Sequence, residues 1–514
     1  MKSKFVLLKS KDDYSYSHYP ASPLSTMTGF VGTAGEGILD GEGHITLFVD
    51  PRYHIQADIQ TKGKDVTVVK TDSQFGFVFY LKNFLPKNSV LEVPEKSTGF
   101  SFYKKLQKEL EGIEIIPYKT EEDFSSIDNA ESPVFEVPVK IAGETANMKI
   151  KKLKKENFLI TNLEEIAYLL NLRSFKTKET AVFRSKLFIQ NENKAFLFTD
   201  YKLPEISPII KAKPMSEYED FIKGISSNVL IDIDSISLYD YNLLQSPKPV
   251  RKNPAVKMAS IKNKFEINHY KDSFRRLDYA LFGFRDKIKE GLSEFELNGI
   301  FEKELIREGA FCTSFKTILA IDDNSSIIHY TANSKDKILK KGSIILLDCG
   351  GYYEGGYATD ITRVFVCGAP LNEEIKEIYT AVLKAQLNVY NSKLLMSDEL
   401  DNLAKKILKK YEKKGFYFPH GLGHGIGIPV HQFPPILSNR FKIKIRNGNV
   451  FTVEPGLYCA GKFGIRLENT VYLDKGEKIS LSHFPYEENL ISYDILNKKE
   501  QKWLLNWQEA SKRI

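Results

Sequence analysis

The C-terminal half of the chain combines helical and strand patterns of apolar residues. In four segments apolar side chains recur every three or four positions, which predicts amphipathic helices. The four segments are 267–291, 294–308, 372–391 and 398–414. Ser293 and Glu296 form a capping-box pattern at the start of the second helix, and Gly415 is typical of the residue that ends the fourth.

Two short apolar runs in the same region predict neighbouring strands. The run 344–347 ends at Asp348, and the run 361–366 follows Asp360. The segment between them is rich in glycine and tyrosine, which predicts a turn. The pattern therefore places one carboxylate at each end of that turn.

Two further carboxylates lie in segments that alternate polar and apolar residues. Because strand side chains alternate between faces, Glu454 shares a face with Thr452. By the same rule Glu468 shares a face with Arg466 and Thr470. The apolar residues Val453, Ile465 and Leu467 are then expected on the opposite face.

A glycine-rich loop carries His424. The loop runs from Gly421 to Gly427 with glycine at every second position, which lets the backbone turn tightly and bring the imidazole close to a target. It does not match a dinucleotide-binding fingerprint, because Ile426 stands where the third glycine would be needed.

Four carboxylates and one imidazole make up the candidate site: Asp348, Asp360, His424, Glu454 and Glu468. Carboxylates gathered in one buried pocket repel one another unless they take up protons or find partners, and two divalent cations would supply the matching charge. A single acid is usually solvated or paired with lysine, and the chain has 66 acids, so the prediction depends on the ordered set. Oxygen-rich ligands favour manganese, iron(II) or cobalt, with zinc as an alternative.

Histidines gather in the same part of the sequence. Of nine histidines, His329, His420, His424 and His431 lie beside the acids, whereas a lone histidine such as His269 is expected to be a satisfied core residue. Tyr458 follows Glu454 closely and is either a hydrogen-bond donor at the site or a packing residue.

Length and composition indicate a multidomain α/β protein. A chain of 514 residues is expected to form about three domains. Polar or proline-rich segments at 120–133 and 245–254 predict linkers, and we place the domains at 1–125, 126–262 and 263–514. Inspection of the sequence reveals no internal repeat.

Charge and cysteine usage exclude some classes of protein. The net charge of +7 is spread over 73 basic and 66 acidic residues, so we expect no nucleic-acid binding. The N-terminal apolar run is too short for a signal peptide, and no segment has membrane-spanning length, so we expect a cytoplasmic protein without a membrane partner. The four cysteines are expected to be core thiols, not disulfides or metal ligands.

The motifs together resemble aminopeptidase P of the pita-bread metallopeptidase family, in its three-domain form. The resemblance is carried by Ile328–Tyr330, Thr359–Arg363, His420–Gly425 with Val430-His431, Thr452–Gly456 and Gly464–Asn469. Residues 29–35 and 49–53 resemble the first domain of that enzyme, 163–173 its second domain, and 481–504 its C-terminal extension. Methionine aminopeptidases share the metal set but lack the long N-terminal half.

The resemblance implies two creatinase-like α/β domains followed by a pita-bread catalytic domain, and a homodimer. It implies hydrolysis of the Xaa-Pro bond in peptides with proline in second position, by a water activated between two metal ions, for which Mn²⁺ is the preferred choice. Asp360 and Glu468 would bridge the metals, Asp348 and His424 would complete the two shells, and Glu454 would be both a ligand and the proton acceptor. His329 and His431 would contact substrate, with His420 and Arg466 in supporting positions, and Arg52 matches a family position that approaches the substrate.

Two features depart from the family pattern. Asp348 and Asp360 are one residue further apart than expected, which we interpret as an extra residue in the turn, as in a bulge at Gly355-Gly356. Gln432 stands after His431 where an acidic residue is usual, so His431 would be held less easily as an imidazolium.

Two alternatives remain open at this stage. Prolidase, which cleaves only Xaa-Pro dipeptides, has much the same ligands. A pita-bread domain that has lost catalysis and serves in binding is disfavoured, because all five ligands and both flanking histidines are present.

Overall fold

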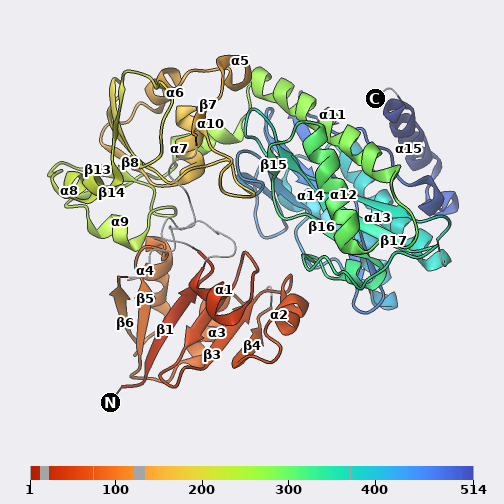
Figure 1. The fold of residues 1–514 in the computed structure, drawn as a ribbon, viewed down its shortest axis with the longest axis horizontal. Helices are drawn as coiled ribbons and strands as arrows, with labels where there is room; N and C mark the ends of the chain where they lie inside the picture. The colour runs from red at the N-terminus through yellow and green to blue at the C-terminus, as the bar shows by residue number, and fades with distance from the viewer. Residues whose placement is uncertain (1, 12–21, 73–74, 120–132, 371, 513–514) are drawn as a thin grey trace. The chain divides into compact units, whose positions relative to one another are not determined.

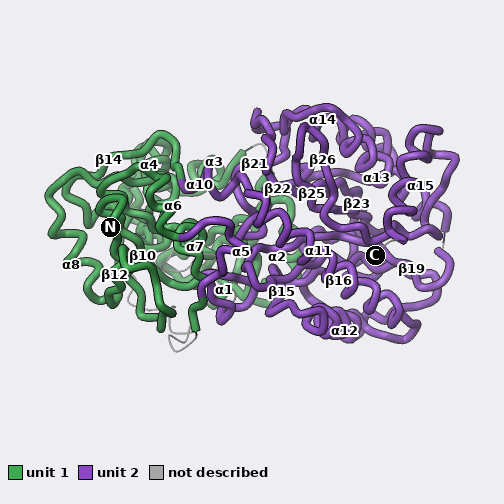
Figure 2. Tube along the Cα trace, turned by 90° about the horizontal axis from the view of Figure 1, so that it is seen from above, with its two compact units in different colours: residues 1–135, 146–172, 183–254 green, residues 136–145, 173–182, 255–514 purple. Residues whose placement is uncertain are grey.

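The computed structural model describes residues 2–11, 22–72, 75–119, 133–370 and 372–512. The chain divides into two compact units, coloured separately in Figure 2. One unit comprises 1–135, 146–172 and 183–254, and the other comprises 136–145, 173–182 and 255–514. The predicted linker at 120–133 falls almost entirely outside the described residues.

The first unit begins with a six-stranded mixed sheet in the order β4-β3-β2-β1-β5-β6. Its strands are β1 (Lys4–Lys9), β2 (Glu36–Leu39), β3 (Ile45–Val49), β4 (Val66–Lys70), β5 (Val90–Pro94) and β6 (Glu114–Tyr118). The helices beside it are α1 (Pro23–Thr28), α2 (His54–Gln60), α3 (Phe77–Phe84) and α4 (Phe100–Glu109). Leu7 packs with buried residues of α3 and α4, whereas Leu8 packs with those of α1 and α2. Strand alternation thus gives the sheet a helical layer on each face.

A second six-stranded sheet in this unit has the order β12-β11-β10-β8-β13-β14 (Figure 1). Its strands are β8 (Phe158–Ile160), β10 (Lys186–Asn191), β11 (Lys194–Phe198), β12 (Ile210–Lys213), β13 (Val229–Ile231) and β14 (Pro247–Pro249). The accompanying helices are α6 (Ala146–Leu153), α7 (Leu163–Leu170), η2 (Met215–Glu217), α8 (Tyr218–Lys223) and α9 (Leu238–Asn242). Part of the segment predicted as an irregular linker is the strand β14, where prolines are tolerated because it is an edge strand.

The two sheets share one topology. In the first sheet, β2 pairs antiparallel with both β1 and β3, and in the second sheet β10 pairs antiparallel with both β8 and β11. All other pairings in the two sheets are parallel. The first unit therefore contains a repeat of topology, in agreement with the expectation of two α/β domains of one kind, although inspection of the sequence reveals no repeat. The short strands β7 (Phe135–Glu136) and β9 (Leu172–Arg173) lie where the chain leaves one unit for the other.

The second unit is built on an eight-stranded antiparallel sheet in the order β16-β17-β19-β25-β22-β20-β21, with β26 paired to β25. Its strands are β16 (Ile318–Ile321), β17 (Ile344–Cys349), β19 (Ile361–Val366), β20 (Gly423–Gly425), β21 (Gln432–Leu437), β22 (Val450–Val453), β25 (Glu468–Asp474) and β26 (Glu477–Ser480). Two small two-stranded antiparallel sheets pair β15 (Cys312–Thr313) with β18 (Gly351–Tyr352) and β23 (Gly456–Cys459) with β24 (Phe463–Arg466).

Helices cover both faces of this sheet. They are α5 (Val139–Ala142), α10 (Pro254–Ser260), α11 (Lys264–Arg285), α12 (Glu294–Arg307), α13 (Glu373–Asn391), α14 (Ser397–Leu408) and α15 (Lys498–Ser511), with 3₁₀ turns η3 (Asp322–Ser326), η4 (Lys409–Lys414), η5 (Glu488–Leu490) and η6 (Tyr493–Ile495). On β19, Val364 packs into the core cluster that contains α13, whereas Phe365 packs edge-on against Phe284 of α11. Phe284 also meets Phe301 of α12, which runs beside α11 in Figure 1. The architecture is therefore α/β/α.

The helices predicted in this unit are present, with shifts at some ends. The capping box of Ser293 and Glu296 is confirmed at the start of α12. The helix predicted over 267–291 begins earlier, because Asn263 and Glu266 form a second capping box, and it ends at Arg285. The last predicted helix becomes a 3₁₀ turn after Leu408 and stops at the left-handed Gly415, as expected.

The structure also tests the expectations about the four cysteines and about membrane-spanning segments. All four cysteines are free, as predicted, but only Cys349 is a buried core thiol. Cys459 is partly exposed but packs against the core of the second unit. Cys312 and Cys367 are partly exposed, and their interpretation as core residues was wrong. Among the described residues, no helix has both the length and the apolarity that a membrane crossing requires.

Candidate metal centre

The five predicted ligands come from strands that are neighbours in the large sheet. Asp348 lies at the end of β17, Asp360 precedes β19, and Glu468 begins β25. Glu454 follows β22, and His424 is the middle residue of β20. Because β17, β19, β25, β22 and β20 are adjacent in that order, side chains from five separate segments converge.

Distances within this group are those of a ligand cage. Nε2 of His424 lies 3.6 Å from Oδ2 of Asp360 and 3.6 Å from Oε1 of Glu454. One ligand atom each from Asp360, His424 and Glu468 lies within 4.8 Å of the other two. Ligand atoms about 2 Å from one ion would have separations of this order.

The glycines around His424 have a specific steric reason. A Cβ at Gly423 would lie 2.1 Å from the carbonyl oxygen of Thr452, so only glycine lets β20 approach β22 this closely. The backbone N–H of His424 donates to Oγ1 of Thr452 at 3.1 Å. The close approach brings the imidazole beside Glu454, which follows β22.

The tautomer of His424 follows from its hydrogen bond. Nδ1 lies 3.1 Å from the carbonyl oxygen of Gly425, which can only accept, so Nδ1 carries the proton. Burial lowers the pKa of His424 to about 4, and the ring is therefore neutral near pH 7. The Nε2 lone pair faces the carboxylates, as metal coordination requires.

Three buried carboxylate oxygens test whether a cation fits. In the described parts of the chain, no group donates a hydrogen bond to Oδ1 of Asp348, Oδ1 of Asp360 or Oε1 of Glu468. Leaving buried acceptors without donors is costly, and such groups need an explanation. Buried carboxylate oxygens without a donor also occur elsewhere, as at Asp398 and Asp401, but these three belong to predicted ligands on neighbouring strands, so the donor set fits divalent cations.

The electrostatics lead to the same conclusion. Burial and the neighbouring Glu468, Asp348 and Glu454 raise the pKa of Asp360 well above its ordinary value. Burial and Asp348 raise the pKa of Glu468 to about 8. Without cations the pocket would therefore hold protons at neutral pH, whereas bound divalent ions would let the carboxylates ionise.

Arg466 organises one side of the group. Its Nη2 donates to Oδ2 of Asp348 at 2.6 Å, and its Nε donates to Oγ1 of Thr362 at 3.1 Å. Thr362 in turn donates to Oε2 of Glu468 at 2.8 Å. Arg466 thus fixes two predicted ligands, one directly and one through a threonine.

The same arginine leads to Tyr458 and His420. Nη1 of Arg466 donates to the phenol oxygen of Tyr458 at 2.8 Å. Nδ1 of His420 donates to the carbonyl of Gly421 at 2.8 Å, so its neutral Nε2 accepts from Tyr458 at 3.0 Å. Nδ1 of His420 is also 4.0 Å from Oε2 of Glu454. Tyr458 therefore belongs to the site's hydrogen-bond network, in addition to being buried.

The other predicted site residues differ in how closely they approach the metal group. The ring of His431 is exposed and stands edge-on to that of His424, with 4.3 Å between centroids. His329 is half-buried in the segment that follows η3. Arg52 lies in the other unit, where its guanidinium pairs with Asp50 at 2.6 Å, and its approach to substrate stays a prediction.

The structure describes the surroundings of both departures from the family pattern. Residues 353–356 form a turn closed by Gly356 N–H to the carbonyl of Tyr353 at 2.8 Å, with Gly356 left-handed, so the predicted β-bulge was wrong. Gly355 N–H donates to Nε2 of His269 at 3.1 Å, which confirms His269 as a satisfied core histidine.

The side-chain oxygen of Gln432 accepts a hydrogen bond from the ammonium group of Lys262. Burial lowers the pKa of Lys262 to about 7.

Sequence reasoning missed a residue that supports two ligands. Gln386 of α13 donates from Nε2 to the carbonyls of Val453 at 3.1 Å and Leu467 at 2.9 Å, which immediately precede Glu454 and Glu468. Its only sequence signal is a polar residue within the apolar stripe of a helix. Val453 and Leu467 themselves face the core, as predicted.

Comparison with family models divides the chain into three matches. Residues 268–475 match the model of metallopeptidase family M24. Residues 24–123 and 128–266 match two models of the creatinase/prolidase N-terminal domain.

Curated relatives fall into two groups. A probable Xaa-Pro aminopeptidase P of Laccaria bicolor is 26% identical over 97% of this chain and 86% of its own length. The Xaa-Pro aminopeptidase 1 of Dictyostelium discoideum is 27% identical over 95% and 86%. An Xaa-Pro dipeptidase of Pyrococcus horikoshii is 33% identical over 52% of this chain and 76% of its own length.

Solved structures share the fold. An X-prolyl aminopeptidase from Caenorhabditis elegans, described as a cytosolic enzyme with a di-nuclear active site, covers 99% of this chain and 91% of its own, with a TM-score of 0.88 and 22% identity. The prolidase of Pyrococcus horikoshii covers 67% and 99%, with a TM-score of 0.57 and 27% identity. The predicted fold, two creatinase-like α/β domains followed by a pita-bread domain, is confirmed.

Proposed function

Because this chain belongs to metallopeptidase family M24 and carries two creatinase-type N-terminal domains, we propose that it is a metal-dependent Xaa-Pro aminopeptidase. It would release the N-terminal residue from peptides with proline in second position. The observation that carries the proposal is the cluster of Asp360, Glu468 and the neutral His424, in which one ligand atom of each residue lies within 4.8 Å of the other two. Buried carboxylate oxygens of Asp348, Asp360 and Glu468 lack donors among the described residues. Relatives that match nearly the whole chain support the aminopeptidase class.

The proposed ligands are Asp348, Asp360, His424, Glu454 and Glu468, with Asp360 and Glu468 shared between two ions. Manganese is the preferred choice, with cobalt, iron(II) and zinc as alternatives, because the donors are mostly hard oxygens. When bound, two such ions supply a Lewis acid for the scissile carbonyl and lower the pKa of a water.

The remaining steps belong to side chains of this protein. Glu454 takes the proton of the attacking water, since its carboxylate borders both His424 and His420. His420 and Tyr458 form a hydrogen-bonded pair beside that carboxylate and keep it oriented. His431, exposed beside His424, donates to the oxygen on which negative charge develops.

Substrate specificity follows from the chemistry of proline. An Xaa-Pro bond is a tertiary amide with no N–H and a fixed φ, so a site that grips that N–H cannot place it. We propose that His329 and His431 contact substrate near this bond, with Arg466 supporting the site from behind Asp348 and Arg52 contributing from the N-terminal domain. The domains are proposed to extend over 1–125, 126–262 and 263–514, and the protein to act as a cytoplasmic homodimer.

The test is hydrolysis of an Xaa-Pro-Yaa tripeptide beside the matching Xaa-Pro dipeptide, with chelator-treated protein before and after addition of manganese. Manganese-dependent cleavage of the tripeptide at the Xaa-Pro bond is expected. Glu454→Gln is the matched inactive variant, and it excludes a contaminating peptidase.

Prolidase is the second candidate, favoured by the higher identity of the archaeal dipeptidase over the catalytic half. Cleavage of the dipeptide alone would establish it and overturn the aminopeptidase proposal. If neither peptide is cleaved with any divalent metal, the protein is a binding module.

A further inference from the structure

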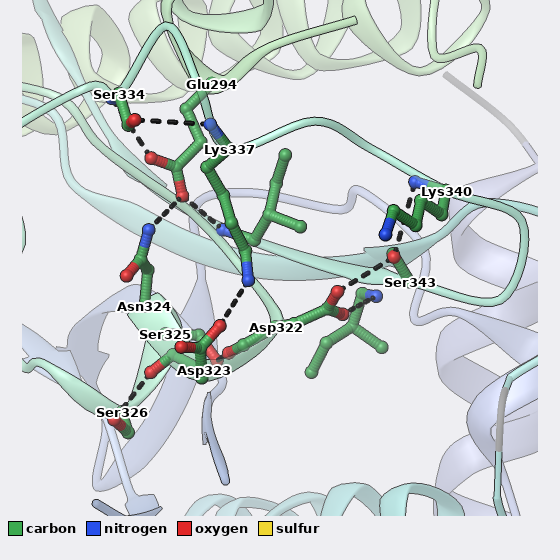
Figure 3. Close-up of polar contacts among 12 residues, drawn as sticks. Glu294, Asp322, Asp323, Asn324, Ser325, Ser326, Ser334, Lys337, Lys340 and Ser343 are labelled. Carbon is green, nitrogen blue, oxygen red and sulfur yellow. Dashed lines mark hydrogen bonds and ion pairs between the residues drawn. The ribbon is translucent and has the colours of Figure 1, made fainter. Parts of the chain in front are cut away.

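Glu294, the first residue of α12, gathers four hydrogen bonds from one short segment. Its Oε1 accepts from the backbone N–H of Ile321 at 2.8 Å and from Nδ2 of Asn324 at 2.9 Å. Its Oε2 accepts from the hydroxyl of Tyr330 at 2.6 Å and from the N–H of Ser334 at 3.1 Å. The carboxylate is fully buried, and Figure 3 shows it facing Asn324 and Ser334. One side chain therefore ties down both ends and the middle of segment 321–334.

The helix start strengthens this connection. The N–H of Glu294 donates to the carbonyl of Lys337 at 3.1 Å, and that of Phe295 donates to the carbonyl of Ser334 at 3.2 Å. The first N–H groups of a helix have no partner within the helix, and here carbonyls of Ser334 and Lys337 accept from them. In return, the Glu294 side chain of the helix accepts hydrogen bonds from segment 321–334. The positive end of the helix dipole also favours the buried carboxylate.

A second anchor lies at the start of η3. Asp322 has a φ of +50°, a left-handed conformation that a residue with a side chain adopts only when its surroundings impose it. Its carboxylate accepts from Oγ of Ser343 at 2.8 Å and from the N–H of Ile344 at 3.0 Å (Figure 3). Asp323 next to it forms an ion pair with Lys337. The backbone of η3 is thus held from two sides.

The anchored segment carries His329. The N–H of Ile327 donates to the carbonyl of Asn324 at 3.0 Å, and that of Tyr330 donates to the carbonyl of Ile327 at 3.1 Å. These consecutive turns fix the backbone on both sides of His329. Because the Tyr330 hydroxyl is bonded to Glu294, the residue after His329 cannot move without breaking a buried hydrogen bond.

The segment also contacts the strand that bears Arg466. Oγ of Ser325 accepts from the N–H of Gly464 at 2.8 Å, and a Cβ at Gly464 would lie 2.2 Å from the carbonyl oxygen of Ser325. Gly464 and Arg466 both belong to β24, and Arg466 bonds Asp348. The contact holds segment 321–334 against the metal centre.

We propose that Glu294 is a positioning residue that acts through Tyr330 to hold His329 in its substrate-contacting place. This inference rests on the proposed function of the site and extends it, since Glu294 has no contact with the predicted ligands in any bond described above. Tyr330 transmits the constraint, and the Asp322 anchor keeps the start of the segment in register.

The decisive variant is Tyr330→Phe, which keeps the ring and removes the hydroxyl bonded to Glu294. Tyr379→Phe is the matched control, because Tyr379 is also buried and its hydroxyl accepts a hydrogen bond from Glu487 N–H at 2.8 Å, away from segment 321–334. Both variants should lose similar thermal stability. Only Tyr330→Phe should lower kcat on the tripeptide, by about tenfold to a hundredfold, with metal content unchanged.

A double-mutant cycle separates positioning from general destabilisation. In a His329→Ala background, Tyr330→Phe should cause no further loss of kcat, because the residue it positions is gone. Wild-type kcat in Tyr330→Phe, or losses that multiply in the double variant, would overturn the proposal.

Hydrogen exchange gives a readout that does not depend on activity. The amides of Ile321 and Ser334 should exchange slowly in the wild type and faster in Glu294→Gln, with the amides of β25 unchanged. Equal protection of these two amides in both proteins would also overturn the proposal. Failure of the proposed function is distinguishable, because then the wild type itself would not cleave the tripeptide, whatever the exchange result.

Discussion

Arg466 and Asp348 form a buried ion pair, with 2.6 Å between Nη2 and Oδ2. The other carboxylate oxygen of Asp348 is buried and has no donor among the described residues, so it remains available to a cation. An arginine fork also reaches Thr362 and Tyr458, which the single ammonium of a lysine cannot do.

Arg466→Lys is therefore expected to weaken metal binding or turnover by about tenfold to a hundredfold, as is typical of outer-shell changes. Titration of chelator-treated protein with manganese, followed by activity, measures both. Arg276→Lys is the matched control, since Arg276 donates hydrogen bonds to the carboxylate of Glu354 and to the carbonyl of Glu308 at the end of α12, in the same unit. Equal affinity and turnover in Arg466→Lys and wild type would contradict the role assigned to the fork.

Glu454→Gln should lower kcat by about a hundredfold or more, because an amide cannot accept the proton of the water. The fold should survive, since the substitution conserves shape. Steady-state kinetics together with the thermal midpoint test this, and Glu477→Gln on the exposed hairpin of β25 and β26 is the control. A variant with wild-type kcat would show that another group accepts the proton.

His431→Ala should reduce turnover by about a hundredfold while metal content stays the same, because the ring stands beside the ligand His424 without sharing its position. Metal analysis and kinetics on the same sample check both parts. His483→Ala removes an exposed imidazole in the C-terminal tail and should have no effect. Loss of metal from His431→Ala would mean that His431 is itself a ligand.

Metal should stabilise the protein more at higher pH. Without metal, burial and Asp348 raise the pKa of Glu468 to about 8. The protonated carboxyl group therefore stabilises the folded protein in acid, and this stabilisation is lost as the pH rises from about 4.5 to 8. Bound cations reverse this loss, because they favour the ionised carboxylate. His424, with a pKa of about 4, competes for protons only below this window.

Thermal unfolding of chelated and manganese-loaded protein should therefore differ by several degrees at about pH 7.5 and by roughly half as much or less at about pH 5.5. A metal-induced shift of equal size at both pH values would contradict proton release from the pocket.

Gly423→Ala should destabilise the protein by about 2–3 kcal/mol and abolish metal binding, because the added methyl group would meet the Thr452 carbonyl at 2.1 Å. Gly299→Ala is the control: it lies within α12, has no atom close to the added methyl group, and should raise the free energy of unfolding by about 0.5–1 kcal/mol. Chemical denaturation measures both, and similar values for the two variants would contradict the steric account.

The four carboxylate residues predicted as ligands could be identified from the sequence because each lies at or beside the end of a strand with an apolar pattern, and His424 because it stands in a glycine-rich loop. The same holds for the start of α12, where Ser293 and Glu296 give a local signal. Gln386 and Glu294 could not be predicted in this way, since their partners lie far along the sequence and are brought near only by the folded chain. The shared topology of the two N-terminal sheets followed from the resemblance of both segments to one kind of domain, and not from a repeat visible in the residues.

Gln386 fixes the backbone next to two of the predicted ligands, and this limits which parts of the site can move when different ions bind. Its amide holds the peptide groups just before Glu454 and Glu468, and its oxygen accepts from the hydroxyl of Tyr486 at 2.8 Å, in the chain beyond β26. The spacing of the two strands is thus set from the helical layer, independently of the carboxylates. Ions of unequal radius would then be accommodated by side-chain torsions over an unchanged backbone, so exchange of one divalent metal for another should alter rate more than structure.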